Sequence, residues 1–292
     1  MRSLLFHLSL LTFLSTLSWA KPLTLAVNQK VDIVLADILN KDTAVALKTK
    51  ATQKECLSLL KKHQVELAIL QNDTAYHIYK GTGKESTPKL RVIVALYTKI
   101  LTFITRKDSN ITSLDDAQRK HARVSFAIND TETTCQTIFS DFDINCSIAL
   151  TKFEYAKIYL QQDKISGFFT LQAHPSEEIQ TLLKEQNITI VPLISKKMAQ
   201  VKMKHDFFIK EHIPKEIYNT KDDIQSIGVK TLLVTTSDVS EEDIYKVTKT
   251  ILNNLENFKK ANPIYHGISK KTLLEGLTIP QHKGAIKAFN EH

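Results

Sequence analysis

A polar stretch, Gln71 to Thr74, directly follows the short apolar run Leu67–Leu70. An apolar run of this length followed by polar residues predicts a buried strand that ends where a helix begins. Ligands of open α/β sheets bind at the carboxyl ends of strands, so amide and carboxylate side chains at this point could hold a solute. Asp73 or Thr74 could equally well cap the new helix, and the sequence leaves both interpretations open.

The sequence gives little support for nucleophilic catalysis, metal binding or nucleotide binding. His121, His174 and His205 could assist a nucleophile, but no serine lies in a G-x-S-x-G turn. Neither Cys nor His residues have the paired spacing of a zinc site. The chain has only seven glycines, and no glycine-rich loop follows a strand to cradle a phosphate. We therefore expect a protein that is not an enzyme and that holds no metal or cofactor.

Composition indicates a globular chain with ordinary hydrophobic cores. Of the 292 residues, 42% are hydrophobic, and the formal net charge is +8. A basic balance could favour anionic partners. The lysines are scattered along predicted helices, however, and no basic run is interleaved with stacking aromatic residues, so we do not expect a nucleic-acid partner.

The first twenty residues have the pattern of a secretory signal peptide. Arg2 gives a positive start, Leu4 to Leu17 is mostly apolar, and Ser18-Trp19-Ala20 has the spacing that signal peptidase cleaves. A retained anchor is the alternative, but the apolar stretch is shorter than the roughly 20 residues of a spanning helix. We expect a soluble exported protein whose mature chain begins at Lys21.

Export makes a disulfide feasible, since the periplasm is oxidising. Cys135 and Cys146 flank a short predicted helix and turn, whereas Cys56 lies on a helix that should pack inward. A Cys135–Cys146 bridge would contribute on the order of 3 kcal/mol if its geometry allows. The alternative is that both are small buried hydrophobic residues, and we favour the bridge.

Strand and helix patterns alternate along the chain, which favours α/β layers. Thr52 to Glu55 has the reciprocal capping pattern of a helix start, and Gly81 is typical of a helix stop. Ile244, Val247, Ile251, Leu255 and Phe258 form one apolar stripe of a long helix after Ser237–Asp243. Other predicted strands are Leu23–Val27, Arg123–Ala127 and Ile165–Thr170, and other predicted helices are Val31–Leu39, Thr131–Phe139 and Lys152–Gln162.

Several segments in this order resemble the TAXI-type extracytoplasmic solute receptors, which hand small molecules to TRAP transporters. The segments that carry the resemblance are Val65–Gly83 with Leu90–Ser109, then Ser113–Glu132, Phe153–Pro175, Ile227–Phe258 and Gly276–His292. The resemblance implies a two-lobed type II periplasmic binding protein fold, of class α/β, with a hinge of two crossing segments. It further implies a discontinuous lobe I of residues 21–105 plus 224–292 and a lobe II of residues 106–223.

The chain departs from the family pattern at places that matter for the ligand. The family has a Gly-rich, Tyr-containing segment after its first strand, and this chain has Asn28 to Asp32. A small Ser/Gly/Thr loop in the second lobe is replaced by Asn129 to Glu132. Asp130 and Glu132 would stabilise a helix start through its dipole. If either carboxylate faces the cleft, it should repel an anion and attract an ammonium or hydroxyl group.

The resemblance assigns ligand contacts by position. Gln71 and Asp73 would lie at the first strand end with Tyr97 beside them, and Gln172 and His174 would lie in a loop that closes over the ligand. Tyr97 could also be half-buried core, and His174 could be a hydrogen-bonded rim residue. The contacts across the cleft would be Asn129, Asp130, Thr131, Glu132 and Thr133.

The function implied is that of a monomeric periplasmic receptor, which captures a small organic acid or amino acid, such as a glutamate-like molecule or a dicarboxylate. Its partner would be the membrane subunit of a TRAP transporter. The alternative is a periplasmic sensor, signalling or interaction protein that keeps the receptor fold without transport, which the altered cleft wall would suit.

Overall fold

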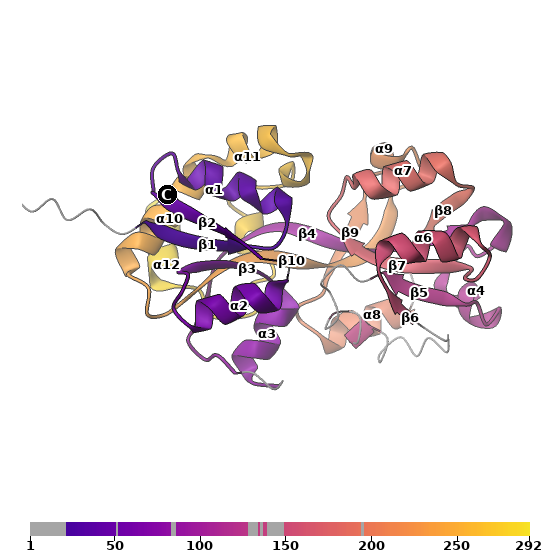
Figure 1. Cartoon of the computed structure of the whole chain (residues 1–292), viewed down its shortest axis with the longest axis horizontal. Coiled ribbons are helices and arrows are strands. Elements are labelled where there is room, and N and C mark those ends of the chain that lie inside the picture. The colour runs from indigo at the N-terminus through magenta and orange to yellow at the C-terminus, as the bar shows by residue number, and fades with distance from the viewer. Residues whose placement is uncertain are drawn as a thin grey trace, which may run out of the picture.

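The computed structural model describes residues 22–50, 52–82, 86–127, 134, 137–138, 149–193 and 196–292. Within them, one mixed sheet of ten strands runs through the whole molecule, with helices on both faces (Figure 1). The expected α/β class is therefore confirmed.

Lobe I is built from the strands β1 (Leu23–Val27), β2 (Val45–Thr49) and β3 (Leu67–Gln71). β1 pairs in parallel with both β2 and β3. Around these strands lie η1 (Lys30–Asp32), α1 (Ile33–Leu39), α2 (Gln53–Lys61), α3 (Asn72–Lys80), α10 (Glu241–Asn253), α11 (Leu255–Ala261), η3 (Pro263–Tyr265), η4 (Thr272–Leu274) and α12 (Lys283–Glu291).

Lobe II contains the remaining short strands, among which β5 pairs in parallel with both β6 and β7. Its strands are β5 (Val124–Ala127), β6 (Ala149–Thr151), β7 (Gly167–Gln172), β8 (Ile188–Val191) and β9 (Ile209–Ile213). Its helices are η2 (Lys107–Ser109), α4 (Leu114–Arg119), α6 (Phe153–Gln161), α7 (Glu177–Glu185), α8 (Lys196–Lys204) and α9 (Lys215–Tyr218).

Two long strands belong to both lobes. β4 (Leu90–Arg106) and β10 (Ile224–Thr236) pair antiparallel along their length and cross from one lobe to the other (Figure 1). The hydrophobic cores divide along them: Tyr97 still packs in a lobe I core, and Leu101 in a lobe II core. The expected hinge of two crossing segments is thus β4 with β10. The exact lobe boundaries stay a prediction.

Local sequence signals account for several element ends. Thr52 and Glu55 form the reciprocal capping box at the start of α2. Gly81 ends α3 in the left-handed conformation, with φ of 69°, which glycine adopts without the Cβ penalty. Ser113 caps α4 by accepting from the Asp116 amide.

One expected helix differs from the structure. The stripe from Ile244 to Phe258 lies on two helices, because the helical conformation is interrupted at Asn254, between α10 and α11. The predicted helix Thr131–Phe139 and the predicted bridge Cys135–Cys146 fall almost entirely outside the described residues. None of the helices in the described part of the chain has the length and apolar composition of a membrane span.

Candidate ligand-binding site

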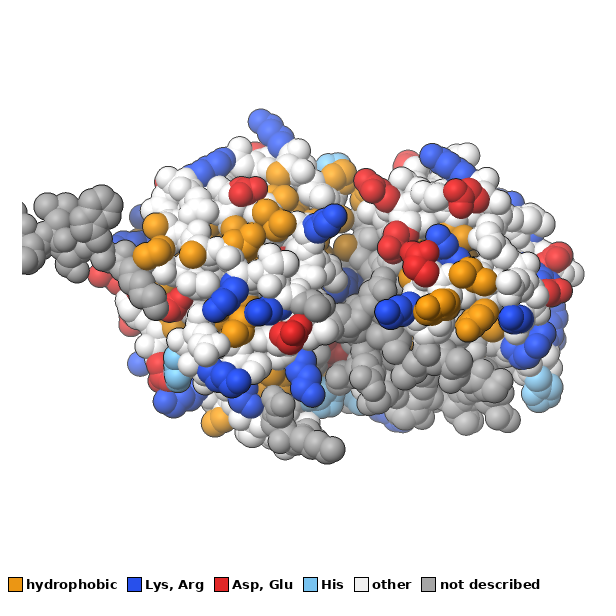
Figure 2. Space-filling view, in the orientation of Figure 1, with side chains coloured by type: hydrophobic (Ala, Val, Ile, Leu, Met, Phe, Trp, Pro, Cys, Tyr) orange, Lys and Arg blue, Asp and Glu red, His pale blue; other side chains and the backbone are white. Residues whose placement is uncertain are grey.

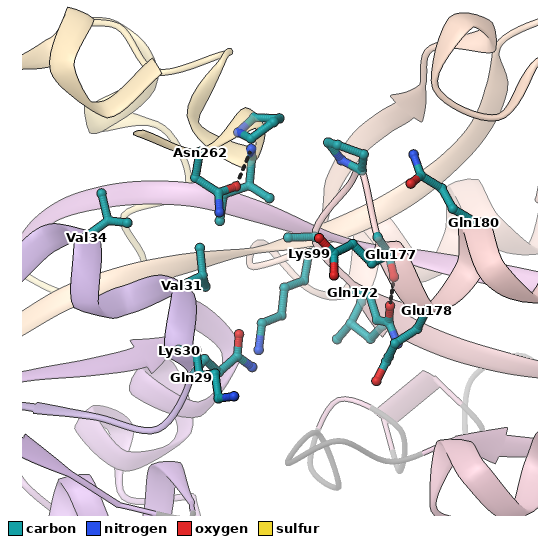
Figure 3. Close-up of a pocket in the computed structure, with 16 residues that line it drawn as sticks. Gln29, Lys30, Val31, Val34, Lys99, Gln172, Glu177, Glu178, Gln180 and Asn262 are labelled. Atoms are coloured by element: carbon teal, nitrogen blue, oxygen red, sulfur yellow. Dashed lines mark hydrogen bonds between the residues drawn. The ribbon is translucent and has the colours of Figure 1, made fainter. Parts of the chain in front are cut away.

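A pocket of about 730 Å³ lies between the two lobes, beside the hinge (Figure 3). Lobe I contributes the segment after β1 and the region of η3, and lobe II contributes the β7–α7 loop and the start of α7. Lys99 enters from β4. The lining residues are Gln29, Lys30, Val31, Val34, Lys99, Leu171, Gln172, Ala173, Pro175, Ser176, Glu177, Glu178, Gln180, Asn262, Pro263 and Ile264.

Charges of opposite sign line the two sides of this pocket. Lys99 reaches from the hinge toward Gln29 and Lys30 of lobe I, and Glu177 and Glu178 stand on the lobe II side (Figure 3). Lys99 is only 4% exposed. In the space-filling view, acidic side chains also border the lobe II rim of the hollow between the lobes (Figure 2). The pocket can therefore form ion pairs with either sign of charge.

The β7–α7 loop is fixed by its own side chains. The Ser176 hydroxyl donates to Gln172 Oε1 at 2.5 Å and accepts the Ile179 amide at 3.3 Å, which caps α7. Gln172 Nε2 donates in turn to Glu178 Oε2 at 2.7 Å. Gln172, predicted as a contact, thus lies in the pocket wall and orients an acidic neighbour.

His174 supports this loop from behind and is not one of the lining residues. Its ring nitrogens lie 3.0 Å from Thr102 Oγ1 and 2.6 Å from the Tyr218 hydroxyl. Burial lowers the pKa of His174 from 6.5 to about 3, so the ring is neutral at physiological pH. The Ser176 amide also donates to the Tyr218 oxygen at 3.0 Å.

Tyr97 has a similar place behind the lobe I wall. Its ring packs edge-to-face on Tyr265 with centroids 5.5 Å apart, and its hydroxyl donates to Asp32 Oδ1 at 2.8 Å. Burial raises the pKa of Asp32 to about 6, while the bond from Tyr97 and the charge of Lys99 act in the opposite direction. Asp32 directly follows the lining residue Val31, so this pair positions the wall.

Gln71 and Asp73 lie at the end of β3, as the sequence predicts, and both are buried. The Thr134 hydroxyl, from lobe II, bonds to both side chains, with 3.3 Å to Gln71 Oε1. Burial raises the pKa of Asp73. Asp73 Oδ1 also accepts the Thr74 amide at 2.7 Å. These residues therefore join the lobes at a second place and do not line the pocket above.

The remaining predicted contacts, Asn129, Asp130, Thr131, Glu132 and Thr133, lie outside the described residues. Cys56 is buried on α2, as expected. In the described ranges we find no group of three or more His, Cys, Asp and Glu side chains arranged to hold a metal ion.

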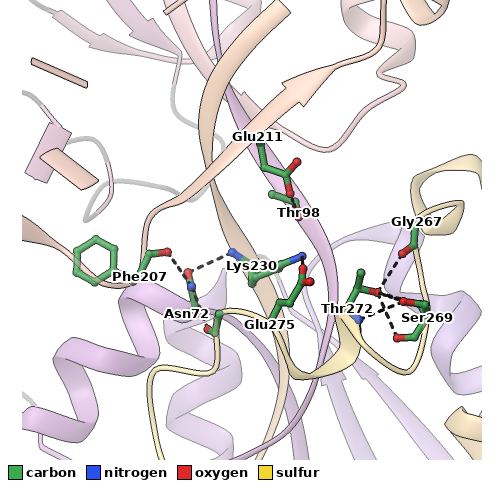
Figure 4. Close-up of polar contacts among 10 residues, drawn as sticks. Asn72, Thr98, Phe207, Glu211, Lys230, Gly267, Ser269, Thr272 and Glu275 are labelled. Atoms are coloured by element: carbon green, nitrogen blue, oxygen red, sulfur yellow. Dashed lines mark hydrogen bonds and ion pairs between the residues drawn. The ribbon is translucent and has the colours of Figure 1, made fainter. Parts of the chain in front are cut away.

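Sequence reasoning missed Lys99 and the acidic pair of α7, and it also missed Asn72. Buried Asn72 begins α3, and its Nδ2 donates to the carbonyl oxygens of Phe207 at 2.9 Å and Gly276 at 3.2 Å (Figure 4). Its Oδ1 accepts the Lys230 amide at 3.2 Å. Asn72 thus connects lobe I, the hinge strand β10 and the lobe II segment before β9.

Several solved structures of solute- and ligand-binding proteins have a similar architecture. A TctC solute binding protein from Polaromonas is 12% identical with a TM-score of 0.55, covering 94% of this chain and 97% of that chain. MatC from Rhodopseudomonas palustris with bound malate is 9% identical with a TM-score of 0.56, covering 84% and 88%. The GluR0 ligand binding core with L-glutamate is 9% identical with a TM-score of 0.52, covering 85% and 98%. The chain therefore has the two-lobed periplasmic binding protein fold.

Sequence similarity defines the family more closely than these structures do. The profile of the NMT1-like family matches residues 26–292, which is nearly the whole chain. The match includes both lobes and the two hinge strands. The chain belongs to the NMT1-like family.

Proposed function

We propose that this protein is a periplasmic receptor that captures a small organic acid or amino acid between its lobes and delivers it to a membrane transporter. The observation that carries the proposal is the pocket of about 730 Å³ lined by both lobes and by Lys99 of the hinge. Its volume falls in the range of about 300–1,000 Å³ that is usual for small-molecule sites. A ligand that contacts both lobes stabilises the closed form over the open one.

The residues divide into those that would touch the solute and those that hold the walls. Lys99, Gln172, Glu177 and Asn262 offer polar atoms to the pocket. Tyr97 and His174 act one layer behind. Gln71 and Asp73, with Asn129 to Thr133 across from them, would form the opposite end of the cleft.

The finer assignments rest on the sequence. The resemblance to TAXI receptors supports a TRAP-type membrane partner, and the pattern of residues 1–20 supports export to the periplasm. We further propose that lobe I comprises residues 21–105 and 224–292, that lobe II comprises residues 106–223, and that Cys135 and Cys146 form a bridge. The receptor would act as a monomer.

Native mass spectrometry of mature protein isolated from its own periplasm tests the proposal. We expect one bound small molecule per chain, which is then released and identified. Gln172→Trp should abolish binding of that molecule in calorimetry, whereas Glu185→Trp, on an exposed site at the far end of α7, should not. A cleft that is empty and gives no thermal shift with acids, amino acids or amines would instead favour the sensor or interaction alternative.

A further inference from the structure

The pocket between the lobes is polarised, and this polarity limits the solutes that it can hold. Lys99 and Lys30 stand on the side of lobe I and the hinge, and Glu177 and Glu178 stand on the side of lobe II (Figure 3). The two signs of charge are therefore contributed by different structural units.

The ammonium of Lys99 is the more constrained of the charges. Lys99 is 4% exposed, on a strand that is buried over most of its length. Its charge acts on Asp32, the buried carboxyl behind the lobe I wall. A lysine withdrawn from water to this extent is stabilised further by an anionic group that enters the pocket beside it.

The carboxylates of Glu177 and Glu178 are not needed to cap α7. Ser176 already fills that role through the bond from the Ile179 amide to its hydroxyl. Glu178 is instead held by Gln172 Nε2, and both glutamates border the pocket. Two carboxylates on one rim repel an approaching anion and attract an ammonium group.

We infer that the pocket selects a solute carrying both a carboxylate and an ammonium group, with the carboxylate toward Lys99 and the ammonium toward Glu177 and Glu178. This inference rests on the proposed function. A simple dicarboxylate would bring a second negative charge to the acidic rim, and a diamine would bring a positive charge to Lys99. Both are disfavoured by repulsion and by an unmatched charge. Because Lys99 lies on hinge strand β4 and the two glutamates lie on lobe II, a zwitterion that contacts both would connect the hinge to lobe II.

Calorimetry with four five-carbon probes tests this selection: glutarate, 5-aminopentanoate, 1,5-diaminopentane and L-glutamate. L-glutamate differs from glutarate only by its α-ammonium group, and 5-aminopentanoate carries an ammoniomethyl group (CH2NH3⁺) in place of one carboxylate of glutarate. We expect at least one of the two ammonium-bearing acids to bind about tenfold or more tightly than both glutarate and the diamine, since one charge-assisted contact is worth about that factor.

Two variants identify the groups responsible. Lys99→Met should weaken binding of the preferred acid about tenfold or more. In the double variant Glu177→Gln/Glu178→Gln, the ratio of the affinity for the preferred acid to the affinity for glutarate should fall by a similar factor. Lys184→Met and Glu185→Gln, on exposed sites of α7 away from the pocket, serve as matched controls and should leave affinities unchanged. Circular dichroism confirms that each variant is folded.

The outcomes separate the two proposals. Glutarate or the diamine binding as tightly as both ammonium-bearing acids would overturn the charge selection and leave a receptor. If neither Lys99→Met nor Glu177→Gln/Glu178→Gln changed the relative affinities for the probes, the charge selection would be overturned as well. If no probe binds and the native protein also carries no solute, the receptor function fails together with the inference.

Discussion

The Tyr97 hydroxyl donates a 2.8 Å hydrogen bond to Oδ1 of Asp32, a residue 65 positions away in the sequence. This bond joins hinge strand β4 to the segment that forms the lobe I wall of the pocket. Asp32 is fully buried, and its Oδ2 has no hydrogen-bond partner among the described residues. The wall is thus held by a carboxyl group whose charge is costly in this place.

Asp32 makes stability depend on pH in a defined direction. Its pKa is about 6 in the folded protein and about 4 in an unfolded chain. Folding therefore holds this proton more tightly, so the stabilising contribution is complete below about pH 4 and is lost as the pH rises through about 6. Asp32→Asn keeps an acceptor for Tyr97 and removes the charge. We expect the variant to exceed wild type in unfolding free energy at pH 7.5 by on the order of 2–3 kcal/mol.

Urea unfolding at pH 7.5 and pH 4.5 checks this expectation. The advantage of Asp32→Asn should shrink at pH 4.5, where wild-type Asp32 is mostly protonated. Asp37→Asn, on an exposed site of α1, provides the control and should show no such change between the two pH values. An equal advantage of Asp32→Asn at both pH values would contradict the assignment.

His174 should give the opposite trend. Its pKa is about 3 in the folded protein, below the usual 6.5, so its neutral ring stabilises the fold fully above about pH 6.5. This contribution is lost as the pH falls toward 3. His174→Gln should cost about 1–3 kcal/mol at pH 7.5, because bonds to Thr102 and Tyr218 are lost.

The difference in unfolding free energy between wild type and His174→Gln should be smaller at pH 4.5, by on the order of 2 kcal/mol. Only wild type has the His174 ring, so only wild type loses the stability that depends on its neutral form. Chemical unfolding at the two pH values measures it. His266→Gln, at an exposed position of lobe I, is the control. A deficit that grows on acidification would refute a neutral His174.

Local signals predicted the elements well where the determining contacts are local. The capping box of Thr52 and Glu55 and the left-handed Gly81 are both present, and β1 has the predicted bounds Leu23–Val27. The interruption at Asn254 was missed because it depends on a side-chain hydrogen bond. Asn254 Nδ2 donates to the Thr250 carbonyl at 2.8 Å, which is the acceptor that the Asn254 backbone amide would use in a continuous helix. Phe258 remains buried after the break, so the apolar stripe alone gives no warning of it.

The pocket was predictable only in part, since its charges depend on how the lobes meet. Gln172 is a polar residue at a strand end, and that position marks it as a candidate. Lys99 lies within a strand of 17 residues, where nothing local distinguishes a side chain that enters a cleft from one that reaches solvent. Glu177 and Glu178 have the ordinary pattern of acidic residues in a first helical turn. The pocket-facing role of these three residues therefore appears only in three dimensions.

Asn72 should be among the most sensitive polar residues of the hinge region. Asn72→Ala removes the side-chain bonds to Phe207, Gly276 and Lys230, of which the Phe207 carbonyl and the Lys230 amide belong to buried residues. We expect a loss of about 2–4 kcal/mol in unfolding free energy. Asn257→Ala, which removes one bond from an exposed asparagine of α11, should change it by no more than about 0.5 kcal/mol. Urea unfolding of both variants compares them, and equal losses would argue against the hinge role of Asn72.

Gly284 allows the packing of the C-terminal helix α12 against α10 to be tested directly. A Cβ atom at position 284 would collide with the Glu241 carbonyl oxygen and lie 2.8 Å from the Tyr245 backbone nitrogen. Both are helix backbone atoms that cannot rotate away, so Gly284→Ala must separate the helices. We expect a loss of at least about 2 kcal/mol in unfolding free energy. Gly267→Ala is the matched control, because its Cβ would meet nothing within 4 Å. Thermal unfolding of the two alanine variants should differ clearly in midpoint; an unchanged midpoint for Gly284→Ala would show that α12 can move without cost, and lobe I would then be less rigid than its packing implies.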